Sequence, residues 1–136
     1  MKVSDSEYDL NTRSTLKGFF TVDELKCKCG CNTIEMDLPF LHKLVKIREE
    51  LGLPMIVSSG YRCAKHPEEA KKKGAYWQGH VEGRAIDVKY KSKSYRAKLI
   101  RIAYKHGMRG IGIANSFVHL DDRDWDALYF YPGFKG

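Results

Sequence analysis

Three short apolar runs near the C-terminal end constrain the fold of this chain most strongly. They cover residues 110–114, 117–121 and 127–131, and turn-forming residues separate them. Runs of this length and spacing predict three consecutive strands. Residues 55–57 and 85–88 are two further candidates for short buried strands. We therefore predict a small, mostly antiparallel sheet.

Two segments repeat apolar residues at helical spacing. The first begins after Asp37, a good N-cap residue, and ends before Gly52. The apolar face of this helix consists of Leu38, Leu41, Leu44, Val45 and Leu51. The second helix runs from Ser94 to His106. Helices of this kind must bury their apolar faces, so we expect an α+β fold with the helices packed on one side of the sheet.

The length of 136 residues suits one compact domain. Residues 1–18 are polar and irregular in pattern and predict an N-terminal arm, followed by a single domain over residues 19–136. Residues 21–24 match a capping box and predict a short helix. No apolar run reaches the roughly 18 residues that a membrane span needs. We expect a monomer made in the cytoplasm without a signal peptide and without membrane insertion.

The chain is basic, with 24 Lys and Arg against 17 Asp and Glu, a formal net charge of +7. This excess favours anionic partners, which include nucleic acids, anionic membranes and cell-wall polymers. Binding to nucleic acid would rest on the charge and on aromatic residues such as Tyr76, Trp77 and Tyr129. No helix-turn-helix, RNP-like or finger pattern accompanies them, so we expect no specific nucleic-acid partner.

The four cysteines are Cys27, Cys29, Cys31 and Cys63. Three of them fall within five residues, which is too tight for an ordinary disulfide framework. Structural zinc sites usually use two separated Cys-x2-4-Cys arms, which this spacing does not match. The pattern favours buried free thiols, with a disulfide and a structural zinc site as alternatives.

A histidine and an aspartate flank a glycine-bearing turn in the segment Gly79-His-Val-Glu-Gly-Arg-Ala-Ile-Asp87. A second histidine lies on the predicted strand 117–121, where alternation places His119 and Asp121 on one face. Two histidines and one carboxylate, with a fourth position for water, form the coordination of a catalytic zinc. The alternative is that His80 is a loop histidine and His119 a hydrogen-bonded core histidine.

Three stretches of the chain resemble the zinc D-alanyl-D-alanine carboxypeptidase family. They are Ser58-Ser-Gly-Tyr-Arg-Cys-Ala-Lys-His66, residues 79–88 and the pair of strands over residues 110–121. That family shares its metal site with hedgehog signalling domains and includes phage L-alanyl-D-glutamate peptidases. Residues 20–31 resemble the segment that precedes the core in small phage and prophage members. The resemblance covers about residues 19–121 and implies a hedgehog-like fold.

The resemblance also implies roles for individual residues. The implied zinc ligands are His80, Asp87 and His119. Arg62 matches an arginine that steadies the polarised carbonyl oxygen or the substrate carboxylate, a role that suits a fixed guanidinium. His66 and Ser59 match positions on the substrate side of the site. The alternatives are an exposed loop histidine for His66 and a residue that shapes the turn for Ser59.

One position departs from the family pattern. Many relatives carry an acidic residue three positions before the last zinc histidine, where this chain has Ser116. We predict that Asp121 replaces it as the general base that takes a proton from water. The alternative is that Asp121 only orients His119 or pairs with a nearby Lys or Arg. Asp122 and Asp124 are weaker candidates for the base.

The resemblance therefore implies a zinc-dependent peptidase that hydrolyses peptide bonds of bacterial peptidoglycan. It would be of the D-Ala-D-Ala carboxypeptidase or the L-Ala-D-Glu endopeptidase type, and a phage or prophage lytic enzyme that acts at the cell wall after release. The alternative is a non-catalytic zinc module that binds the wall or forms part of a virion.

Overall fold

The computed structural model describes residues 2–3, 19–31, 33–64, 66 and 79–136. Most of the predicted N-terminal arm lies outside these residues. Within the arm, Lys2–Val3 forms strand β1, which pairs antiparallel with β2 (Met36–Asp37). No helix in the described parts of the chain has the length and apolar character to cross a membrane.

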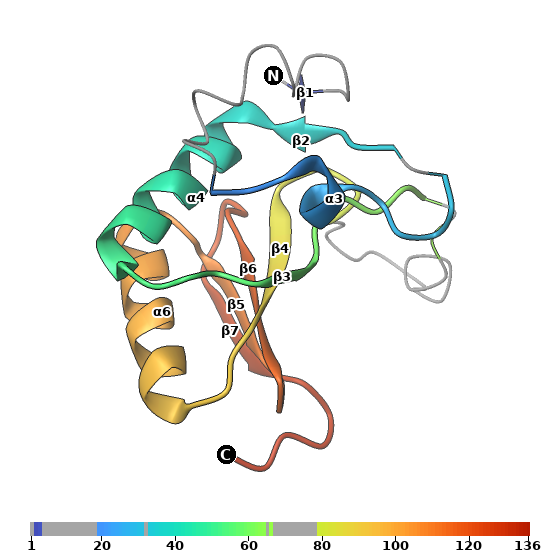
Figure 1. Cartoon of the computed structure of the whole chain (residues 1–136). Helices are drawn as coiled ribbons and strands as arrows, with labels where there is room; N and C mark the ends of the chain where they lie inside the picture. Colours follow the sequence, from blue (N-terminus) through green and yellow to red (C-terminus); the bar gives the residue numbers. More distant parts are fainter. Residues whose placement is uncertain (1, 4–18, 32, 65, 67–78) are drawn as a thin grey trace.

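A five-stranded sheet forms the centre of the molecule (Figure 1). Its strands in spatial order are β3 (Val57–Ser59), β4 (Ala85–Lys89), β6 (Phe117–Asp121), β5 (Gly110–Ile113) and β7 (Ala127–Phe130). The first three neighbouring pairs are antiparallel, and β5 and β7 are parallel. The sheet is therefore mixed, and the prediction of a mostly antiparallel sheet was wrong.

The parallel pair follows from the route of the chain between β6 and β7. Asp121 at the end of β6 and Ala127 at the start of β7 both pair with Gly110. The chain therefore leaves β6 and enters β7 at the same end of the sheet, and β5 lies between the two strands. A sequence pattern of consecutive short strands does not reveal that the third strand skips its neighbour.

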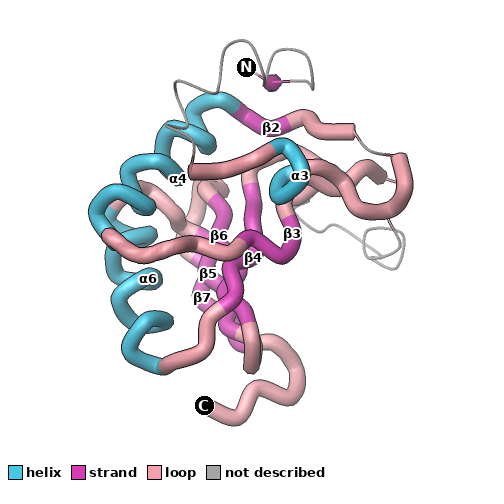
Figure 2. The backbone as a smooth tube through the Cα atoms, viewed as in Figure 1, coloured by secondary structure: helices cyan, strands magenta, loops and turns pink. Residues whose placement is uncertain are grey.

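Helices α4 (Leu38–Leu51) and α6 (Lys93–Lys105) pack against each other and cover one face of the sheet (Figure 2), as predicted. Helix α4 begins at its expected cap, since the Asp37 side chain accepts a hydrogen bond from Phe40 N at 3.2 Å. It ends at Gly52, whose φ of 68° is a left-handed conformation that glycine adopts without steric cost. The apolar side chains between helices and sheet form the core of the domain.

Two predicted boundaries move by one or two residues. Helix α6 begins at Lys93 because Ser92, not a later residue, caps it by accepting from Tyr95 N at 3.1 Å. Strand β3 begins at Val57 and continues to Ser59, because Ser59 still pairs with Asp87 on the neighbouring strand β4. The strand therefore includes the start of the Ser-Ser-Gly-Tyr-Arg segment, which the prediction placed after it.

Helix α3 (Val22–Leu25) confirms the predicted capping box. Glu24 N donates to Thr21 Oγ1 and Thr21 N donates to Glu24 Oε1, both at 3.2 Å. The end of this short helix contacts the segment after β3, because Tyr61 N donates to Leu25 O at 2.7 Å. Residues 25–31 and 60–63 are thereby held together, although they are distant in sequence.

Candidate metal centre

The register of the sheet builds one row of residues that crosses four strands. Asp87 on β4 pairs with His119 on β6, His119 pairs with Gly112 on β5, and Gly112 pairs with Tyr129 on β7. Directly paired residues point to the same face of a sheet, so Asp87 and His119 project side by side. The opposite face carries the aliphatic residues, including Ile86 and Leu120, that pack into the core.

His80 reaches this row from the turn that precedes β4. The turn is closed by two backbone hydrogen bonds, from Gly83 N to His80 O at 3.3 Å and from Arg84 N to Gly79 O at 2.9 Å. His80 Nδ1 lies 2.7 Å from Gly60 O. A carbonyl oxygen only accepts, so Nδ1 carries the proton and Nε2 is left as a lone-pair donor facing Asp87.

Three ligand atoms converge at the centre of the row. Asp87 Oδ1 lies 3.4 Å from His80 Nε2 and 3.1 Å from His119 Nδ1, and one ligand atom from each of the three residues lies within 4.8 Å of the others. Zinc bonds of about 2.0–2.1 Å in tetrahedral geometry imply ligand separations of about 3.3 Å. All three residues are buried. The donor set and its spacing fit a zinc ion.

Burial and hydrogen bonding give His80 and Asp87 the protonation states that metal ligands need. Burial lowers the pKa of His80 and favours the neutral imidazole. Burial is also the largest influence on Asp87 and would raise its pKa. Hydrogen bonds with His119 and His80 outweigh that effect and hold the pKa of Asp87 below its usual range. A neutral histidine and an ionised carboxylate are the forms that bind a metal.

Asp121 lies on the other side of the His119 ring. Its Oδ2 is 2.6 Å from His119 Nε2, the nitrogen that faces away from Asp87. Arg123 donates to the same carboxylate through Nε at 2.8 Å and Nη2 at 2.7 Å. Gly110 makes room for this arrangement, because a Cβ there would collide with both Asp121 oxygens. These contacts match the alternative in which Asp121 orients His119, and its predicted role as base stays a prediction.

The pKa values of the pair reflect the same contacts. Burial is the largest influence on His119 and lowers its pKa, but hydrogen bonds with Asp121 and Asp87 outweigh it and raise the pKa. Burial would raise the pKa of Asp121, but Arg123 and His119 outweigh it and the pKa falls below its usual range. Asp121 is therefore ionised and committed to two cationic or hydrogen-bonding partners.

Arg62 lies beside the ligands. Its Nη2 donates to Asp87 Oδ2 at 3.4 Å, and its Nε donates to Ser59 Oγ at 3.0 Å. The Arg62 side chain is 14% exposed. Ser59 thus holds Arg62 in position, which agrees with a residue that shapes this segment. The predicted contact of His66 with substrate stays a prediction.

The weaker base candidates belong to a separate set of ion pairs. Asp122 is buried and accepts from Arg84 Nε at 2.7 Å and from Lys43 Nζ at 3.0 Å. Asp124 is exposed and lies 3.8 Å from Arg84. None of these three ion pairs involves a candidate ligand.

Two tyrosines at the site were not predicted. Tyr129 and Tyr131 project from β7 and just beyond it, with ring centroids 5.6 Å apart, and the Tyr129 ring lies 6.1 Å from that of His119. Gly112 leaves the space they occupy, since a Cβ there would lie 2.5 Å from the Tyr129 ring and 2.8 Å from the Tyr131 ring. Burial raises the pKa of both phenols, so they stay protonated and able to donate hydrogen bonds. Strand alternation put both on one face, but the parallel pairing with β5 was needed to bring them to the metal ligands.

The cysteines agree in part with the favoured prediction of buried free thiols, since all four are free but only Cys27 is fully buried. Cys27 is buried, but Cys29 and Cys31 are exposed and Cys63 is half-buried. No disulfide joins them, and one sulfur from each lies within 4.8 Å of the others. In the described residues this is the second group, after the histidine and aspartate ligands, whose chemistry and spacing suit a metal ion.

Comparison with known proteins places the chain in a family. No curated protein matches the chain. A family model described as Peptidase M15 matches residues 18–121, which is most of the chain and includes all three candidate ligands. The α+β architecture fits the hedgehog-like fold that the sequence resemblance implied. The chain belongs to the Peptidase M15 family, whose members are zinc metallopeptidases.

Proposed function

We propose that this chain hydrolyses a peptide bond in bacterial peptidoglycan with a zinc ion held by His80, Asp87 and His119. The observation that carries the proposal is the convergence of three buried ligand atoms next to the Arg62 guanidinium. A buried ligand set beside a fixed cation is suited to polarising and cleaving a carbonyl compound.

His80, Asp87 and His119 would hold the zinc ion, which would supply Lewis-acid chemistry toward a substrate carbonyl and toward water. Arg62 supplies a fixed positive charge close to the same point. Hydrogen bonds to Ser59 and Asp87 hold the guanidinium next to the candidate ligands in a set direction, where it can meet a carbonyl oxygen or a substrate carboxylate. A guanidinium held in this way stabilises negative charge as it develops on the substrate.

Asp121 has a positioning role in this proposal. A neutral His119 carries one ring proton. With that proton on Nε2, the ring donates a hydrogen bond to Asp121, and the unprotonated Nδ1 faces Asp87. Hydrogen bonds of this kind fix the tautomer and the ring orientation of metal-binding histidines. Arg123 in turn holds the Asp121 carboxylate in place.

The substrate and setting are inferred from the family resemblance and the charge. We propose a D-Ala-D-Ala carboxypeptidase or an L-Ala-D-Glu endopeptidase of phage or prophage origin, acting as a monomer at the bacterial wall. The formal net charge of +7 favours adsorption to anionic wall polymers.

The alternative is a zinc-containing module that binds the wall or a virion component without cleavage. One observation favours it: the Asp121 carboxylate is already engaged by His119 and Arg123. A carboxylate held on both sides is poorly placed to accept a proton from water.

The test is digestion of purified peptidoglycan by the zinc-loaded protein, with the soluble products identified by mass spectrometry. Loss of the terminal D-alanine identifies a carboxypeptidase, and new D-glutamate amino termini identify an endopeptidase. The matched control is His119→Ala, which should release neither product. Zinc-loaded protein that binds the wall and releases no product from any peptidoglycan type would establish the non-catalytic alternative.

A further inference from the structure

The four cysteines form a second cluster of metal-binding chemistry, outside the site described above. We propose that Cys27, Cys29, Cys31 and Cys63 bind a second zinc ion through four thiolates, and that this ion fastens the segment that carries Arg62. Zinc binding by the cysteines does not depend on the proposed function. The importance of fastening Arg62 does rest on the proposed function, because Arg62 has its role there.

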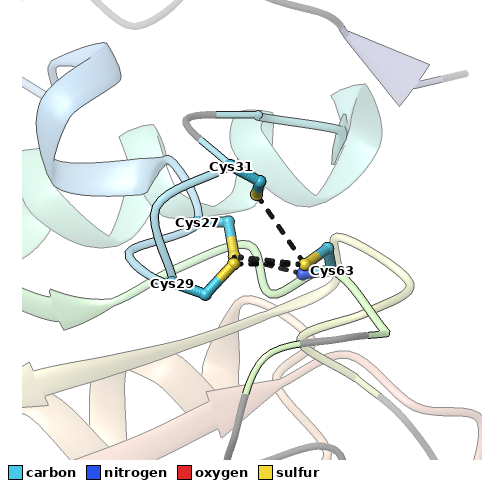
Figure 3. Close-up of side chains that lie close together, drawn as sticks. All are labelled: Cys27, Cys29, Cys31 and Cys63. Atoms are coloured by element: carbon cyan, nitrogen blue, oxygen red, sulfur yellow. Dashed lines mark hydrogen bonds between the residues drawn. The ribbon is translucent and has the colours of Figure 1, made fainter.

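The distances between the sulfur atoms carry the proposal. Cys63 Sγ lies 3.4 Å from Cys29 Sγ and 3.7 Å from both Cys27 Sγ and Cys31 Sγ, and Cys27 and Cys29 are 3.5 Å apart (Figure 3). Zinc–sulfur bonds of about 2.3 Å in tetrahedral geometry imply sulfur separations of about 3.8 Å. A disulfide would require about 2.05 Å. Four of the six sulfur separations are therefore close to those of a zinc tetrahedron, and the other two are no longer than 4.8 Å.

The backbone brings the four thiols together from two sides. Cys27, Cys29 and Cys31 lie on the loop after α3, and Cys63 lies on the segment after β3 (Figure 3). Gly30, with a φ of 108°, allows the loop to turn between the second and third cysteine. This turn replaces the longer spacing of ordinary zinc-binding arms, which is why the sequence pattern did not favour a metal site.

The surroundings suit thiolate ligands. Cys63 N donates to Cys27 Sγ at 3.3 Å, and Cys31 Sγ lies 3.1 Å from Thr33 Oγ1. Hydrogen bonds to a ligating sulfur orient it and stabilise its charge. Cys27 is buried and Cys29 and Cys31 are exposed, so the cluster combines an anchored ligand with access from solvent. Four thiolates fill every tetrahedral position, which is the arrangement of a structural zinc site.

The cluster is linked to the candidate active site through residues 60–63. Arg62 directly precedes Cys63, and Arg62 N donates to His80 O at 3.1 Å. Gly60 O is the acceptor that fixes His80 Nδ1 at 2.7 Å. A metal ion bound by Cys63 therefore restrains the short segment that positions both Arg62 and His80.

The proposal is tested by the zinc content of the full chain purified under reducing conditions. We expect two zinc ions per chain in the natural protein and one in Cys29→Ser and in Cys31→Ser. These two cysteines are exposed, so replacing them by serine leaves the apolar core intact. Lys28→Ser changes the same loop without removing a sulfur, and it should retain two. Cobalt(II) loading should give thiolate-to-metal charge-transfer absorption in the natural protein and in Lys28→Ser, and lose it in the cysteine variants.

Further variants separate this proposal from the proposed function. His80→Ala should retain the cobalt–thiolate absorption while losing the other metal. One zinc per chain that disappears in His80→Ala and is unchanged in Cys31→Ser would overturn the cysteine site and leave the peptidase intact. The cysteine site would also be overturned if the purified protein had an intact mass, under non-reducing conditions, that is lower by two hydrogens for each disulfide formed. Two zinc ions with no peptidoglycan cleavage would instead contradict the peptidase and support the cysteine site.

Discussion

The two clusters of metal-binding residues are built in different ways. The cluster of His80, Asp87 and His119 rests mainly on paired strands, and its members are buried. The cysteine cluster rests on two loops, and two of its members are exposed. In the first, hydrogen bonds to Gly60 and Asp121 orient the two histidine rings. In the second, hydrogen bonds from Tyr61 N to Leu25 O and from Cys63 N to Cys27 Sγ join the two loops.

This difference suits the first cluster to a catalytic metal and the second to a structural metal. Ligands fixed by a sheet can leave one coordination position for a substrate without collapsing, which is what catalysis by zinc requires. Four soft thiolates on loops would use every coordination position for binding, and the metal would then cross-link the two loops. If the sheet cluster governs cleavage, the loss of one of its ligands should have a larger effect than any change to the residues around it.

The largest effect is expected from His119→Ala. Removal of one of three ligands should abolish cleavage of peptidoglycan and release the zinc of this site, while the cysteine cluster keeps its metal. The measurement is the release of new chain ends together with zinc content. Cleavage at the natural rate in this variant would contradict the assignment of the sheet cluster as the active site.

Arg62→Ala should lower kcat by about 10²–10³-fold, the usual effect of removing a group that stabilises the developing charge. Zinc content should not change, because Arg62 contacts the ligands without being one. Arg62→Lys keeps the charge and loses the bidentate geometry, so it should restore part of the rate. A variant without Arg62 that retains full kcat would remove Arg62 from the reaction.

Asp121→Asn separates a positioning carboxylate from a general base. If Asp121 orients His119, we expect a loss of about 10–100-fold in zinc affinity or activity. Asp122→Asn is the matched control, because Asp122 is a neighbouring buried carboxylate bound to Arg84 and Lys43. Abolished cleavage with unchanged zinc affinity would instead establish Asp121 as the base.

Gly112→Ala should destabilise the fold by about 1–3 kcal/mol, since an added methyl group overpacks the site. Its Cβ would press on the rings of Tyr129 and Tyr131, which lie over the sheet face that carries the ligands. Urea unfolding measures the change, and Ser116→Ala, at an exposed position three residues past the end of β5, is the control with no expected effect. Unchanged stability in Gly112→Ala would mean that the tyrosines can move aside.

Much of the fold could be predicted from local patterns. The cap at Asp37, the end at Gly52 and the capping box at Thr21 were recognised because each depends on neighbouring residues alone. The parallel pairing of β5 and β7 was missed because it depends on which strand lies next to which, and strand alternation is the same for either neighbour.

The candidate site shows the same limit. The three candidate ligands were predicted from their chemistry and from resemblance to a family, and the structure brings them together. The contact of Asp121 with the outer nitrogen of His119 could not be read from its position on the strand, because alternation gives the face and not the ring atom. The cysteine cluster was undervalued because its tetrahedral spacing arises from two loops that meet only in the folded chain.

The most direct test of the central claim is a crystal structure of the zinc-loaded protein with anomalous diffraction measured on both sides of the zinc edge. We predict an anomalous peak bonded to His80 Nε2, a carboxylate oxygen of Asp87 and His119 Nδ1. No peak at that position, with His119 Nδ1 still hydrogen-bonded to Asp87 in zinc-loaded crystals, would contradict the account.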